Sequence, residues 1–303
     1  MSVLVDARRW WGRWQAENQG LIDEWRRGLY RFQQSRLSII GTAIIVFLLI
    51  VALTGRSWVP YPEDAGFTTH VKIRLQGPSR EHFFGTDEYG RDIFTRTVWA
   101  TRTSLIAGTV VVLVGGLIGI ILGGIAGYFG GIVNELIMRL TDIMLTMPGI
   151  FLALAITAAL GPGILHAVAA LSITWWPGYC RLVQAQVLSI REEDYVEAAR
   201  CLGASRPRII FSHILPNCLS AIVVKASMDF GFAVLNLAAL GFIGVGAQPP
   251  APEWGAMISK GREFLPYGWW YSTFPGLAMF LTVFGFNMFG DGFRDVFDPR
   301  ARR

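Results

Sequence analysis

The sequence predicts an all-α membrane protein with about six transmembrane helices, and two features support this. Of its 303 residues, 52% are hydrophobic and only 16% are charged, whereas soluble domains carry roughly 25% charged residues. The apolar residues also fall in long blocks with the cations gathered between them. The net charge of +5 therefore indicates membrane topology, and nucleic acid is not an expected partner.

The first 36 residues predict an amphipathic segment on the cytoplasmic side. They hold seven Arg and four acids, and an apolar stripe at helical spacing runs through Trp14, Leu21, Trp25, Leu29 and Phe32. This pattern favours a helix lying in the membrane interface. A solvated helix that docks on its own protein is the alternative.

The first transmembrane helix is expected over 37–54, because the segment Leu37–Leu53 carries no charge and twelve Leu, Ile, Val or Phe residues. A polar outer connection over 55–103 follows, with a short helix expected near 90–100. A five-helix core over 104–290 then contains spans at about 104–128, 135–160, 164–190, 218–246 and 271–290. Residues 291–303 form a cytoplasmic tail.

Two proline-containing stretches modify this core. Pro177-Gly178 is expected to interrupt the span at 164–190, because proline removes a helical hydrogen bond. The last two spans are joined by a Pro-rich connection at 248–255.

Glycine recurs every fourth residue in the span at 104–128, at Gly115, Gly119, Gly123, Gly127 and Gly131. Four residues advance a helix by about 400°, so these glycines form one bare strip. Such strips let helices approach closely in lipid. We expect the strip to pack tightly against another helix and to carry no chemistry.

The cations set the predicted orientation. Arg is abundant in the N-terminal segment, in the segment between the spans at 164–190 and 218–246, and in the tail. Six spans place all three on one side of the membrane, which the positive-inside rule makes the cytoplasm. Both termini are therefore expected to be cytoplasmic.

The cytoplasmic segment 191–217 is expected to contain two short helices. The first spans about Glu192–Leu202 and is stopped by Gly203, and the second spans about 207–216. The small residues Ala198 and Ala199 suit the first helix to a groove on a partner protein. An interfacial helix resting on lipid is the alternative.

Ionisable residues inside spans are functional candidates by default. Lys225 and Asp229 stand four residues apart in the fifth span, on one helical face. One interpretation is that they line a solute path or bind a charged end of a solute. The other is that Lys225 extends toward the membrane surface while pairing with Asp229.

No catalytic or metal-binding set is evident in the sequence. A Walker A loop requires Gly-Lys followed by Ser or Thr, and none of Lys72, Lys225 and Lys260 follows Gly. The four His residues lack metal-ligand spacing, and the three Cys residues lack a CxxC pair. These absences argue against an intramembrane enzyme.

The cytoplasmic segment resembles the EAA loop of bacterial ABC importer permeases. Glu197-Ala198-Ala199 is followed by Gly203 and then by Ile214-Leu215-Pro216. Residues 84–92, 240–257 and 290–300 are similar to further blocks of the dipeptide, oligopeptide and nickel permease family. The similarity extends over roughly residues 30–300 and is greatest to the second of the two paired permeases.

The resemblance implies a type I ABC importer permease fold in the bacterial cytoplasmic (inner) membrane. In such importers two related permeases form the path, and an external binding protein delivers the solute. ATP and Mg are bound by two ATPase subunits or domains, so the permease is not itself an enzyme. The helix that couples to the ATPase maps to about 192–206, with Asp194, Tyr195, Glu197, Ala198, Ala199, Leu202, Gly203 and Ala204.

The resemblance leaves the solute open. Short peptides are the usual cargo of the family, and glutathione, nickel chelates, opines and sugars are alternatives. An ion-driven secondary transporter is disfavoured, because that class usually shows two matching broken helices and only one such break is expected here.

Overall fold

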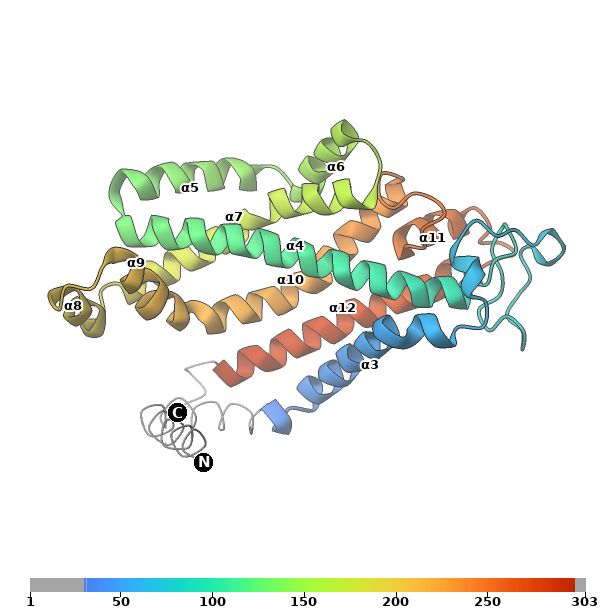
Figure 1. The fold of residues 1–303 in the computed structure, drawn as a ribbon, viewed down its shortest axis with the longest axis horizontal. Helices are drawn as coiled ribbons and strands as arrows, with labels where there is room; N and C mark the ends of the chain where they lie inside the picture. Colours follow the sequence, from blue (N-terminus) through green and yellow to red (C-terminus); the bar gives the residue numbers. More distant parts are fainter. Residues whose placement is uncertain (1–29, 31, 298–303) are drawn as a thin grey trace, which may run out of the picture.

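Long helices run between the two ends of the molecule (Figure 1). The computed structural model describes Tyr30 and residues 32–297. The longest helices are α3 (Arg36–Trp58), α4 (Ile93–Phe129), α7 (Ile164–Ile190), α10 (Leu215–Ile243) and α12 (Trp270–Phe297). Within the described residues the β-structure is one isolated bridge between Thr86 and Asp92, so the predicted all-α class is confirmed.

The six predicted spans each coincide with a helix or a bent pair of helices. Four stretches are long and apolar enough to cross a membrane, at 36–58, 93–129, 206–243 and 270–294. The helices α5 (Gly131–Thr146) and α6 (Gly149–Leu160) qualify together as a fifth. The 27 residues of α7 extend about 40 Å, but polar and aromatic residues make this helix less apolar than the others.

The second span starts earlier than predicted. Its helix α4 begins at Ile93, so the short helix expected near 90–100 is the first part of this span. The cause is Asp92, whose carboxylate accepts a hydrogen bond from the Thr95 N–H at 2.7 Å and caps the helix. The outer connection predicted for 55–103 accordingly occupies only 59–92, because α3 also extends to Trp58.

Proline acts differently in the third and fourth spans from what was predicted. The third span is broken between α5 and α6 by a bend of 86°, because Pro148 holds Met147 in an extended conformation. The helix is not broken at Pro177-Gly178, since α7 continues through Pro177, and the kink expected there stays a prediction. The neighbouring Trp176 backbone and Tyr179 side chain pack against α4 glycines, which holds both halves of α7 in one helix.

The second short helix predicted at 207–216 is not separate from the fifth span. A turn α9 (Arg206–Arg208) and a π-helical segment η3 (Ile209–Ile214) lead directly into α10. Pro216 does not end a helix. It lies at the second residue of α10, directly after η3, and the helical path continues through it.

The last part of the chain holds more helix than predicted. The Pro-rich connection leads into an unpredicted helix, α11 (Trp254–Arg262), and α12 continues to Phe297, into the predicted tail at 291–303. Most of the predicted amphipathic segment 1–36 lies outside the described residues. Phe32 is described, and its ring packs edge-on against Phe289 of α12, with 5.7 Å between centroids.

The bare glycine strip packs α4 against α7 as predicted. A Cβ added to Gly119 would lie 2.4 Å from the Trp176 carbonyl oxygen, and one at Gly123 would lie 2.4 Å from that of Cys180. Gly115 and Gly127 face α7 equally closely. The prediction is wrong for Gly131, which begins α5 beyond the end of α4 and has no neighbour there.

Candidate functional site

The predicted coupling helix forms as α8 (Asp194–Cys201). It lies at one extreme of the long axis, on the side toward which the start of α3 and the end of α12 are directed (Figure 1). Asp194 and Glu197 occupy its first turn and Arg200 its last, as the helix dipole favours. Gly203 follows with a φ of +81°, a conformation in which a side chain is strained.

One face of α8 is anchored to the spans. Val196 is completely buried in an apolar cluster with Val183 and Val187 of α7, Ile209 and Ile214 of η3, and Cys218 and Ile222 of α10. The Tyr195 hydroxyl accepts a hydrogen bond from the Asn217 amide at 3.1 Å. Partial burial and the nearby Glu193 carboxylate raise the pKa of Tyr195, so its hydroxyl stays protonated. These contacts fix α8 to the start of α10.

The opposite face of α8 is open. Glu197, Ala198 and Cys201 are exposed, and Leu202 just after the helix is 88% exposed. A Cβ on Gly203 would have no neighbour within 4 Å. This face therefore presents an exposed leucine beside small residues and one acid.

The eight predicted coupling residues thus divide between two faces. Ala199 and Ala204 are half-buried, and Ala204 packs against the Val196 cluster, whereas Asp194, Glu197, Ala198, Leu202 and Gly203 face solvent. Tyr195 holds the helix while staying 44% exposed. Sequence reasoning missed Val196 as the anchor. The available signal was that it is an aliphatic residue within an otherwise polar or small-residue turn.

A second group of polar residues lies between α7 and α10. The Lys225 ammonium is 3.2 Å and 3.1 Å from the two carboxylate oxygens of Asp229. The Trp175 indole N–H of α7 donates to Asp229 at 3.2 Å, and the Lys225 nitrogen lies 5.0 Å from the centroid of the Tyr179 ring. The pairing predicted for Lys225 and Asp229 is therefore present, and it faces α7.

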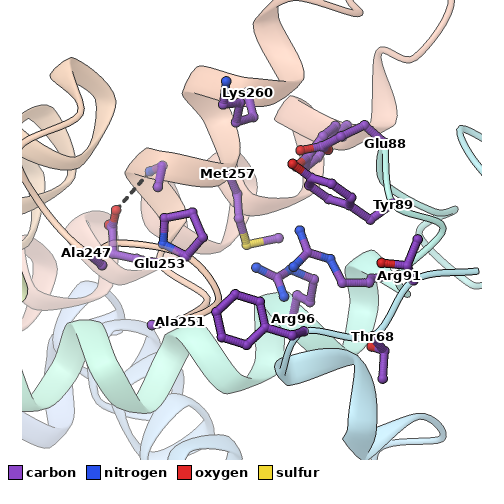
Figure 2. A pocket seen from close by; sticks show the side chains of 15 residues that line it. Thr68, Glu88, Tyr89, Arg91, Arg96, Ala247, Ala251, Glu253, Met257 and Lys260 are labelled. Carbon is purple, nitrogen blue, oxygen red and sulfur yellow. Dashed lines mark hydrogen bonds between the residues drawn. The ribbon is translucent and has the colours of Figure 1, made fainter.

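A cavity of about 210 Å³ lies at the other end of the molecule, between the outer connection, α11 and the start of α12. The guanidinium groups of Arg91 and Arg96 lie next to each other in it, with Met257 of α11 extending toward them (Figure 2). Asp87 forms an ion pair with each of them, at 2.7 Å from Arg91 and 3.8 Å from Arg96.

Glu253 lines this cavity and begins α11. Its carboxylate accepts hydrogen bonds of 2.8 Å from the N–H groups of Gly255 and Ala256, and the residue is 1% exposed. Burial raises the pKa of Glu253 from 4.5 to about 7, although the two N–H groups oppose the shift. Glutamate is not one of the residues usually preferred at an N-cap, so its position before Trp254 was a weak signal of this role.

We expect the stability of the protein to fall as the pH rises from about 4.5 to 7. Folded Glu253 keeps its proton across this window, whereas the unfolded carboxyl loses it, so ionisation disfavours the folded state by about 3 kcal/mol at most. Thermal unfolding of the purified protein between pH 4 and 8 measures this. Glu253→Gln should flatten the profile, and Glu263→Gln, a change at an exposed acid, should not. If the unfolding temperature changed with pH at the same rate in the wild type and in both variants, the pH dependence could not be assigned to Glu253.

Comparison with known proteins identifies the family. Residues 119–303 match the family profile described as binding-protein-dependent transport system inner membrane component. This match covers more than half of the chain. The chain belongs to this family. Residues 24–78 also match the profile of the N-terminal transmembrane domain of oligopeptide transport permease C, in agreement with the resemblance to the second permease.

Relatives of this permease extend over nearly the whole chain. It is 45% identical to a dipeptide transport system permease protein of Alkalihalophilus pseudofirmus, over 93% of this chain and 91% of the relative. The corresponding protein of Escherichia coli K12 is 44% identical, over 90% and 92%. A glutathione transport system permease protein of Shigella sonnei is 40% identical, over 92% and 91%.

Two solved structures of the MetNI methionine ABC transporter, both inward-facing, share the fold of this permease. Their TM-scores are 0.51 and 0.52 at 20% and 21% identity, over 64% and 68% of this chain and 93% and 97% of theirs. The predicted type I importer fold is confirmed. The chain is a multi-span permease subunit of an ABC importer in the inner membrane, which acts with ATPase and substrate-binding partners.

Proposed function

We propose that this permease forms half of a path that imports short peptides, and that α8 transmits the movement of an ATPase to the spans. The observation that carries the proposal is the two-sided placement of α8. Val196 fixes one face to α7, η3 and α10, while Glu197 and Leu202 leave the other free. Force applied to the open face reaches the spans through this anchor, because packed interiors transmit strain.

The assembly we infer has four further parts. A second, related permease completes the path, two ATPase subunits or domains hold ATP and Mg, and an external binding protein delivers the solute. The orientation follows from α8, which must face the cytoplasm to meet an ATPase. The start of α3 and the end of α12 are directed toward the side on which α8 lies (Figure 1), and we infer from this that the chain enters and leaves the membrane on the cytoplasmic side.

The relatives support a peptide as the solute. Two of them are named as dipeptide permeases and are 45% and 44% identical to this chain, whereas the glutathione permease is 40% identical. Glutathione is the second candidate, and it is itself a small peptide with ionised amino and carboxylate groups. Lys225 and Asp229 lie between α7 and α10 with their charged groups partly exposed, and we assign them to the path.

Co-purification and uptake test this function together. We expect an ATPase to co-elute when the permease is isolated with its neighbouring proteins. Proteoliposomes containing the complex and the binding protein should take up a labelled dipeptide only with ATP inside the compartment that α8 faces. Uptake driven by an ion gradient without ATP, or a purified permease that retains no ATPase, would contradict the proposal.

A further inference from the structure

The ion pair of Lys225 and Asp229 lies inside the fifth membrane-spanning helix. Lys225 comes one turn after Ile222, which packs in the cluster around Val196, and Asp229 lies one turn further along α10. Charged groups inside a span are costly in lipid and usually face a cavity, a partner or a solute pathway. The Lys225 ammonium is held by Asp229 and lies over the Tyr179 ring.

The pair is incompletely enclosed. The side chain of Lys225 is 28% exposed and that of Asp229 is 15% exposed, so neither side chain is fully enclosed by this chain. Asp229 already accepts hydrogen bonds from Lys225 and from Trp175 of α7. Lys225 can donate three hydrogen bonds, and within the described part of the chain its ammonium contacts the two Asp229 oxygens and the Tyr179 ring. It therefore retains capacity to bind a carboxylate.

Stability alone does not account for this arrangement. A buried ion pair is often no more stabilising than apolar residues of similar volume. The indole of Trp175 and the ring of Tyr179 add directed contacts from α7 to each charge. The result is a small site that displays one cation and one anion, each supported from a second helix.

We propose that Lys225 and Asp229 contact the two charged ends of a zwitterionic solute during import. The carboxylate of the solute binds Lys225 in place of Asp229. The ammonium of the solute binds Asp229 in place of Lys225. The ends of an extended dipeptide are separated by about 7 Å, a distance that the flexible Lys225 side chain can bridge by rotating away. This inference rests on the proposed import of peptides.

The arrangement predicts selection by charge. The empty site is neutral and stays neutral with a zwitterion bound. A solute that lacks one charged end leaves either Lys225 or Asp229 without a partner, and an unpaired charge in this environment is strongly disfavoured. The membrane subunit would therefore add to the selection made by the binding protein.

Uptake of three matched solutes tests the proposal: dialanine, its N-acetyl form, which is an anion, and its amide, which is a cation. Each is presented at saturating concentration to the complete complex in proteoliposomes. The same binding protein serves every variant, so its own preference cancels when variants are compared. Lys225→Met should raise the ratio of amide to dialanine uptake at least tenfold. Asp229→Asn should raise the ratio of N-acetyl form to dialanine by a similar factor.

The double variant Lys225→Met/Asp229→Asn controls for folding, because it leaves no unpaired charge. It should assemble in normal amount, and the three solutes should be taken up in ratios closer to one another than in the wild type. Ratios unchanged within twofold in assembled variants would overturn this inference alone and leave peptide import standing. A wild-type complex that hydrolyses ATP but imports none of the three solutes would overturn both proposals.

Discussion

Glu197→Arg is expected to abolish ATP-driven uptake while the permease still inserts and folds. Glu197 is exposed on α8, and among the described residues its side chain has no hydrogen bond or ion pair. Changes at such surface positions usually alter the free energy of unfolding by no more than about 0.5 kcal/mol. The substitution reverses a charge on the face assigned to the ATPase, and like charges across an interface suppress binding.

The matched control is Glu263→Arg. It makes the same change of charge at an exposed acid near α11 (Glu263), at the opposite end of the molecule. We expect this variant to transport normally. Uptake and the amount of ATPase that co-purifies are measured for both variants. Normal uptake by Glu197→Arg, or equal loss in both, would count heavily against α8 as the coupling element.

Gly123→Ala should destabilise the folded permease by several kcal/mol or prevent its accumulation. The added Cβ would lie 2.4 Å from the Cys180 carbonyl oxygen and 3.0 Å from the Val183 Cβ. Both atoms belong to α7, so the two helices must move apart. Overpacking of this kind typically costs about 1–3 kcal/mol or more, and here it also separates a backbone contact that small residues permit in lipid.

Gly276→Ala provides the comparison. Gly276 lies within α12, and a Cβ there would meet nothing within 4 Å. Alanine is a better helix former than glycine by about 1 kcal/mol, so this variant should be as stable as the wild type or more so. Yield after membrane extraction and thermal unfolding in detergent distinguish the two variants. Equal stability would mean that α4 and α7 do not pack through glycine.

Helix existence and helix packing could largely be predicted from the sequence. Charge-free blocks such as 37–53 fix the positions of the spans, and four of the five strip glycines pack against α7. The ends and breaks of the helices were harder to predict, because they depend on single residues whose effect is set by the residues packed around them. Pro148 breaks the third span and Pro177 leaves the fourth intact, because the surroundings of Pro177 hold both sides of it in place.

The contacts between distant segments could not be predicted. Asp64 binds the backbone N–H of Asp92 at 2.8 Å, and Arg96 donates to the carbonyl groups of Asp64 and Pro250. Hydropathy contains no information about which polar groups of separate loops will meet. The same limitation applies at the coupling segment, where the pattern located α8 but not the anchoring role of Val196.

Cross-linking from Cys201 tests the central claim most directly. Cys201 lies on α8 and is exposed, whereas the other two cysteines are buried, so the native thiol can carry a benzophenone maleimide. In inverted vesicles of the assembled importer, illumination should produce an adduct with an ATPase subunit, and Glu197→Arg should remove it. Labelling of Cys201 by a membrane-impermeant maleimide added outside intact cells, or adducts with lipid alone, would contradict the account.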